Sequence, residues 1–119
     1  DTWQLMNPTP GAANTQELSL DEALLIPEVF VLRQNYPNPF NPVTTIQYDL
    51  PENSYVNVII YDMLGRQVKT LLNQTQDAGF KSVIWNATNN YGKPVSAGVY
   101  LYQIQAGEFV QTKKMVLLK

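Results

Sequence analysis

Apolar and polar residues alternate along most of the chain from about residue 29 onward. Ile46, Tyr48 and Leu50 alternate with more polar neighbours, and residues 55–62 repeat the pattern. A period of two places one face of a strand on a core and the other face in water. No stretch keeps a helical period long enough to compete, so the pattern predicts β-strands.

Turn-forming residues separate these runs. Gly supplies the positive φ that tight reversals need, and Asn, Asp and Pro favour turns for reasons of their own. Such residues cluster at positions 51–54, 64–65, 77–79, 89–92 and 106–107. We therefore predict seven strands, near residues 29–33, 44–50, 55–62, 66–72, 79–86, 98–106 and 109–118. Short strands with turn signals every ~8–12 residues predict an all-β, antiparallel β-sandwich.

Residues 1–28 lack the alternating pattern of the rest of the chain. We predict that they are an arm or linker from a preceding domain and that residues 29–119 form the sandwich. The prolines and glycine within residues 8–11 exclude a helix or an inner strand there. Residues 17–28 fit one helical turn, a short strand or an extended linker. A strand-exchanged homodimer is one option for the arm. We expect side chains of this arm to pack on the sandwich or on a neighbouring chain. The candidates are Trp3, Leu5, Leu24, Leu25 or Ile26.

The composition excludes several classes of function. The chain has 119 residues, enough for one domain, and contains no Cys and no His, which excludes disulfides, thiolate nucleophiles and imidazole bases. Its net charge is −2 without a basic cluster, so we expect no nucleic-acid site. No apolar run reaches the ~20 residues of a membrane span. The carboxylates are scattered over strand ends and turns, so we expect no enzyme activity, no metal site and no cofactor.

Four segments, in this order along the chain, carry a family resemblance: Gln34–Pro42, Tyr61–Val68, Gly98–Tyr102 and Lys113–Lys119. Each alone is a weak signal, but four ordered motifs are specific. Together they resemble the type A C-terminal sorting domain of the type IX (Por) secretion system of Bacteroidetes-like bacteria. Residues 1–14 separately resemble the closing strand and tail of a lamin-tail-type domain.

The resemblance implies an immunoglobulin-like sandwich at the C-terminus of a larger secreted protein. It implies that the outer-membrane translocon of the secretion system recognises the domain after passage through the periplasm. A sortase-like surface protease commonly removes such domains, and the passenger domains upstream in the same chain are then attached at the cell surface or released. Residues 1–11 lack the basic start and apolar core of a signal peptide, so we expect that signal to lie further upstream.

The proline-rich segment has a structural and a functional interpretation. Its prolines fix φ, remove backbone donors and favour extended neighbours, so we expect a stiff loop that cannot join a sheet. We expect Tyr36 and Phe40 to close one end of the sandwich, because aromatic rings beside prolines are usually buried. The alternative is a rigid surface presented to a receptor. The family-motif residues with an expected structural role are Tyr36, Pro37, Asn38, Pro39, Phe40, Asn41, Pro42, Gly65, Gly98 and Tyr100.

Three further side chains have an expected place in the sandwich. We expect the hydroxyl of Tyr100 or Tyr102 to bond a loop carbonyl, as corner tyrosines of sandwiches do. We expect Trp85 to lie in the core rather than to serve as a ligand platform.

The last strand is the predicted recognition element. On a structural interpretation its lysines protect a sheet edge from unwanted pairing. On a functional interpretation a translocon component adds a strand to the exposed edge. The resemblance favours the second interpretation, with recognition residues Lys113, Lys114, Met115, Val116, Leu117, Leu118 and Lys119.

A carbohydrate-binding or adhesin-type module is the alternative function. Small β-sandwiches often bind sugars with a row of exposed aromatic rings, and the 7 Tyr and 2 Trp of this chain are enough for such a row. A planar row of exposed rings in the structure would favour the sugar-binding module. Rings buried in the core would favour the sorting domain.

Overall fold

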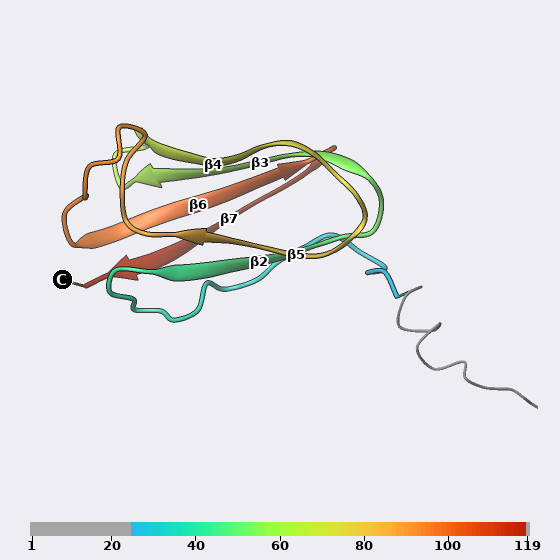
Figure 1. Cartoon of the computed structure of the whole chain (residues 1–119), viewed down its shortest axis with the longest axis horizontal. Helices are drawn as coiled ribbons and strands as arrows, with labels where there is room; N and C mark the ends of the chain where they lie inside the picture. Colours follow the sequence, from blue (N-terminus) through green and yellow to red (C-terminus); the bar gives the residue numbers. More distant parts are fainter. Residues whose placement is uncertain (1–24, 119) are drawn as a thin grey trace, which may run out of the picture.

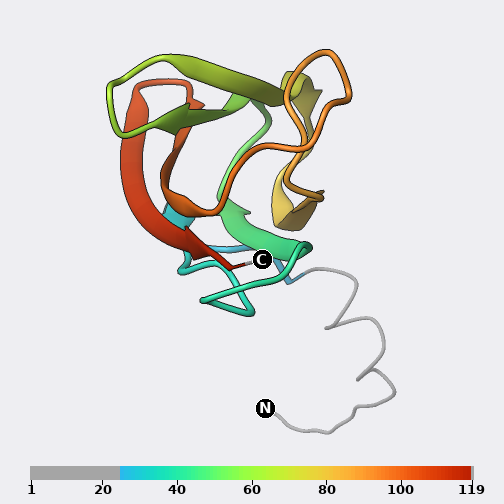
Figure 2. The ribbon, with the colours of Figure 1, turned by 90° about the vertical axis from the view of Figure 1, so that its left-hand side faces the viewer.

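Residues 25–118 of the computed structural model are described here, and they form a sandwich of two antiparallel sheets. One sheet has the order β1-β2-β5, with bounds Val31–Leu32, Thr44–Leu50 and Gly79–Trp85. The other has the order β4-β3-β6-β7, with bounds Gln67–Gln76, Ser54–Asp62, Gly98–Ala106 and Phe109–Leu117. Figure 1 shows both layers running along the long axis, and Figure 2 shows them from one end.

All seven predicted strands are present, and the predicted fold class is confirmed. Two strands, β4 and β1, differ from the prediction by more than one residue at an end. β4 runs on to Gln76 because its polar end continues the ladder with β3, where Gln76 lies opposite Ser54. β1 has only two residues, since it pairs with β2 at Asp49 and Tyr48 alone.

Several expectations about the arm lie outside the described residues. These are the possible helical turn, the lamin-tail resemblance and the packing of Trp3, Leu5 and Leu24. Leu25 and Ile26 are described, and they are 64% and 53% exposed. More than half of each residue is therefore exposed, and neither belongs to the core or to the partly buried residues packed against it.

Inward-facing side chains of both sheets form the core, and aromatic rings fill one end of it. The ring of Phe40 lies 5.8 Å from that of Trp85, which lies 5.4 Å from that of Tyr100. All three are buried, and Trp85 Nε1 donates to the carbonyl of Thr88 at 2.8 Å. Trp85 is thus a core residue, as predicted, and its polar atom is satisfied.

Two tyrosine hydroxyls link β6 to neighbouring segments. Tyr100 donates to the carbonyl of Ser96 at 2.6 Å. Tyr102 donates to the carbonyl of Arg33 at 2.7 Å and accepts from the N–H of Asn35 at 2.8 Å. The expected hydroxyl-to-carbonyl bond is therefore present at both positions. Of these two hydroxyls, that of Tyr102 joins the two sheets, because Arg33 and Asn35 lie in the segment just after β1 of the other sheet.

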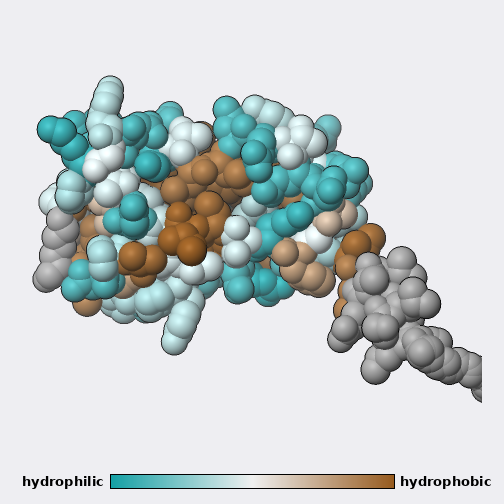
Figure 3. Space-filling view, in the orientation of Figure 1, coloured by the Kyte–Doolittle hydropathy of each residue, from teal (hydrophilic) through white to brown (hydrophobic). Residues whose placement is uncertain are grey.

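The core is closed less completely on the side where β4 and β5 form the sheet edges. Figure 3 shows an apolar area in the middle of this face, between two polar regions. Val68 and Leu71 of β4 and Val83 of β5 are only partly buried, although they pack against the core.

Replacing Tyr102 by Phe should destabilise the fold more than replacing Tyr100 by Phe. Tyr102→Phe removes two hydrogen bonds and leaves the Asn35 N–H and the Arg33 carbonyl unpaired. Because a buried backbone group without a partner costs about 1–3 kcal/mol, we expect a loss of about 2–4 kcal/mol for Tyr102→Phe and about 1 kcal/mol for Tyr100→Phe. Equilibrium urea unfolding measures both values. Equal losses would contradict the different roles given to the two hydroxyls.

Stability should also fall in alkaline solution. Burial raises the pKa of Tyr102 to about 12, and the hydrogen bond from the Asn35 N–H opposes this only in part. Burial likewise raises the pKa of Tyr48, opposed by its bond to Gln76. An unfolded Tyr ionises near a pKa of about 10, so between about pH 10 and pH 12 the unfolded state binds fewer protons than the folded state.

The contribution of Tyr102 is therefore fully present below about pH 10 and is lost as the pH rises toward 12. Urea unfolding near pH 9 and near pH 11 should show a lower free energy of unfolding at the higher pH. The Tyr102→Phe variant should show a smaller decrease. A decrease of the same size in the variant would count against this residue as a cause.

Candidate functional site

The four segments that carry the family resemblance lie together at one end of the sandwich, which we call the loop end. It holds the loop of residues 34–43, the β3–β4 turn, the loop of residues 86–97 and the end of β7 (Figure 1). The strand register brings the segments together, because Asp62 lies opposite Tyr100 and Gly98 lies opposite Leu117. Phe40 then forms a parallel bridge with Leu117. Segments far apart in the sequence thus form one surface.

The proline-rich loop joins both sheets, contrary to our expectation. The N–H of Phe40 donates to the carbonyl of Val116 at 3.0 Å, and the N–H of Leu118 donates to the carbonyl of Phe40 at 2.8 Å. On the other sheet, Tyr36 and Thr45 exchange two backbone bonds of 2.9 Å. The expectation failed because each proline removes only its own donor. The residues between the prolines keep their N–H groups and use them.

Side chains of the same loop also bond to the edge of β7. Asn38 Oδ1 accepts the N–H of Val116 at 3.0 Å, and Gln34 Nε2 donates to the carbonyl of Lys114 at 2.8 Å. In Figure 2 the end of β7 meets the loop at the lower side of the sandwich. The second half of β7 is therefore not an open edge, because this loop occupies its outer side.

Asn35 is a residue of this site that our sequence reasoning did not select. Its side chain is buried, and its Nδ2 donates to Thr44 Oγ1 at 2.9 Å and to the carbonyl of Pro37 at 3.2 Å. Its own N–H donates to Tyr102. These bonds fix the start of the loop against both sheets. Its position in the motif, directly before Tyr36 and Pro37, is the sequence signal that could have indicated its role.

The predicted recognition residues of β7 divide into two groups. The side chains of Met115 and Leu117 are buried in the core, so they are not on the surface. Lys114 and Leu118 are exposed, and Lys113 and Val116 are partly buried. Lys119 lies outside the described residues.

The family-motif residues outside β7 also differ in burial. Phe40 and Tyr100 are buried as expected. Tyr36 is 79% exposed, so the expectation that its ring closes the end of the sandwich is wrong. Its backbone pairs with Thr45, which alternates with the buried Thr44 and Ile46 and therefore faces away from the core. Directly opposite residues of a ladder share one face of the sheet, so the Tyr36 ring also points away from the core.

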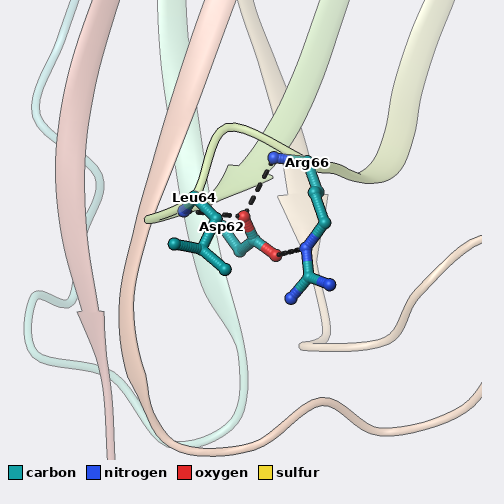
Figure 4. Close-up of polar contacts among 3 residues, drawn as sticks. All are labelled: Asp62, Leu64 and Arg66. Atoms are coloured by element: carbon teal, nitrogen blue, oxygen red, sulfur yellow. Dashed lines mark hydrogen bonds and ion pairs between the residues drawn. The ribbon is translucent and has the colours of Figure 1, made fainter.

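The β3–β4 turn is held by the carboxylate of Asp62 (Figure 4). Asp62 Oδ1 accepts the N–H groups of Leu64 and Arg66, both at 2.9 Å, and Oδ2 accepts Arg66 Nε at 2.9 Å. The pKa of Asp62 is lowered, first by the backbone N–H of Arg66 and further by its side chain and by Leu64, against a smaller effect of burial. Gly65 follows at φ +84°, a conformation that disfavours a side chain.

The loop of residues 86–97 contains a second turn of the same design. Asn89 Oδ1 accepts the N–H groups of Tyr91 and Lys93, and Gly92 has φ +80°. The next residue, Asn90, bonds the outer edge of β4: its N–H donates to the carbonyl of Val68 at 3.1 Å, and its Oδ1 accepts the N–H of Thr70 at 3.0 Å. This loop therefore covers part of the β4 edge.

Five of the twelve aromatic rings in residues 25–118 are buried in the core, and the most exposed ones are spread over both ends of the sandwich. The most exposed rings of the described part of the chain come from different elements: Tyr36 from the proline-rich loop, Tyr55 from β3, Phe80 from β5 and Tyr91 from the loop of residues 86–97. Within residues 25–118 we find no planar aromatic row, which favours the sorting domain over a sugar-binding module.

Over residues 25–118, no three acidic side chains gather closely enough to hold a metal ion. That part of the chain also contains no helix long and apolar enough to cross a membrane.

Comparisons with known proteins agree with this geometry. A sequence model described as "secretion system C-terminal sorting domain" matches residues 34–118. No curated protein sequence matches the chain. The crystal structure of dimeric latent PorU from Porphyromonas gingivalis is similar over 75% of this chain, with 25% identity and a TM-score of 0.59.

A second solved structure shows the same fold. It is PorZ, described as an essential bacterial surface component of the type-IX secretion system of Porphyromonas gingivalis, and it is similar over 72% of this chain, with 23% identity and a TM-score of 0.51. This chain spans only 9% of the PorU chain and 11% of the PorZ chain.

The residues matched by the family model cover most of the chain and include nearly all of the four motif segments that meet at the loop end. The fold is also seen in parts of the PorU and PorZ structures. The chain therefore belongs to the family of secretion system C-terminal sorting domains, and it is a sorting domain.

Proposed function

We propose that this sorting domain directs a larger passenger protein, after its passage through the periplasm, across the outer membrane for attachment at the cell surface or for release. Residues 1–28 connect the passenger to the domain formed by residues 29–119. The observation that carries the proposal is the meeting of the family's motif segments in one surface at the loop end. Tyr36 and Lys114 are exposed motif residues at this end, and packing of the core does not explain their presence in the motif.

In this proposal the chain is recognised and processed by other proteins and catalyses no step itself. The outer-membrane translocon recognises the final strand, Lys113 to Lys119, together with the loop bonded to it. Lys114 and Leu118 offer exposed side chains, while Met115 and Leu117 hold the strand in the core. A sortase-like surface protease then removes the domain from its passenger.

A reporter enzyme fused ahead of the full 119-residue chain should leave the cell in a bacterium that has a type IX secretion system. The reporter should carry its own signal peptide, so that the fusion and its control enter the periplasm by the same route. Reporter activity is measured in the medium, on intact cells and in the periplasm. The matched control is the same secreted reporter without the chain, which should stay in the periplasm. Equal distributions of the two reporters would refute the proposed function.

Removing the Asn38 side chain from this fusion should reduce export more than removing the Asn53 side chain. Each amide oxygen accepts one backbone N–H near the surface, from Val116 at 3.0 Å and from Ala78 at 2.9 Å. Asn38→Ala and Asn53→Ala should therefore each cost about 1 kcal/mol of stability. Only Asn38 lies at the loop end, so only Asn38→Ala should lower the exported fraction. Similar export of the two variants at similar stability would argue against recognition at the loop end.

A further inference from the structure

The outer edge of β7 is closed over one half and open over the other. The N–H and carbonyl of Val116, the carbonyl of Lys114 and the N–H of Leu118 all face away from β6, since the proline-rich loop bonds them. In an antiparallel pair, residues alternate between facing the partner strand and facing away. The backbone N–H and carbonyl groups of Val110 and Thr112 therefore also point away from β6, and so does the N–H of Lys114.

These outward groups have no partner within residues 25–118. None of the hydrogen bonds of the described chain reaches the backbone of Val110 or Thr112 from outside the β6–β7 ladder. The side chains of Val110, Thr112 and Lys114 are exposed, and that of Val110 is 51% exposed. The open half of the edge is thus a row of accessible donors and acceptors on residues 110–114.

The charges beside this row favour one kind of occupant. Lys113 and Lys114 lie next to each other on opposite faces of β7, and the nearest acidic side chain on the strand's own hairpin is Glu108, in the turn before it. Pairing two copies of this edge would bring four lysines together, two from each copy, and like charges across a ladder are destabilising. An acidic strand would find opposite charges on both faces.

We propose that the open half of β7, residues 110–114, is where an extended acidic segment of a partner protein adds as a strand. The segment bonds to the backbone of Val110 and Thr112 and to the N–H of Lys114, and its acidic side chains lie beside Lys113 and Lys114. This inference rests on the proposed function, and it places strand addition next to the half of β7 that the loop already covers.

Thr112→Pro in the full-chain reporter fusion tests the backbone contact. The N–H of Thr112 faces outward, so proline removes an edge donor without breaking the β6–β7 ladder, and edge strands tolerate proline there. Thr112→Val is the matched control, because both variants lose the bond that Thr112 Oγ1 accepts from Gln103 while valine keeps the N–H. We expect export to fall about tenfold in Thr112→Pro and to stay near wild type in Thr112→Val.

Lys114→Glu tests the charge and leaves the backbone unchanged. We expect it to lower export about tenfold. Lys114→Arg keeps the charge, and Lys81→Glu changes a lysine on β5, outside the loop end and away from β7, so both should export like wild type. Thermal unfolding of each purified chain confirms that the variants are folded.

Three results would overturn this inference. The first is a folded Thr112→Pro variant that exports like Thr112→Val, and the second is equal export of Lys114→Glu and Lys114→Arg. The third is a wild-type dimer in light scattering that Thr112→Pro abolishes, because the occupant would then be a second copy. In the first two cases an exported wild-type fusion leaves the proposed function intact. A wild-type fusion that stays in the cell refutes the proposed function, and this inference falls with it.

Discussion

Hydrogen bonds between the proline-rich loop and the edge of β7 hold the loop end in one arrangement. A strand at the edge of a sheet presents unpaired backbone groups, and proteins cover such edges or leave them open to a partner. Here the loop uses the backbone of Phe40 and the side chains of Asn38 and Gln34 to cover residues 114–118. The prolines suit this role, because they limit the conformations of the loop while the residues between them donate.

The opposite edge of the same sheet, β4, is also partly covered by a loop. Asn90 bonds both the carbonyl of Val68 and the N–H of Thr70, so one side chain and its backbone cover part of β4. The two turns nearby are each held by one side-chain oxygen, a carboxylate at Asp62 and an amide at Asn89. Since a neutral amide serves as well as a charged group, geometry rather than charge is the shared requirement of these turns.

The loop end exists as a surface only in the folded domain. Its parts are separated by up to about eighty residues, and Gln34 and Lys114 meet across such a distance. The hydroxyl of Tyr102 fixes the segment that leads into the loop, because it bonds Arg33 and Asn35 on the other sheet. A machinery that recognises this surface would therefore distinguish a folded sorting domain from an unfolded one, which a short linear tag does not allow.

The sequence alone determined the strands, the fold class and the family, because alternation and turn residues are local signals and the motifs are contiguous. Placing Trp85 in the core also followed from its position in a predicted strand. Only the tertiary structure decided that Tyr36 is exposed, that Asn35 is buried and that the loop bonds to β7. These facts depend on which segments the strand order brings side by side, and a backbone hydrogen bond between distant segments leaves no trace in the side-chain pattern of either one.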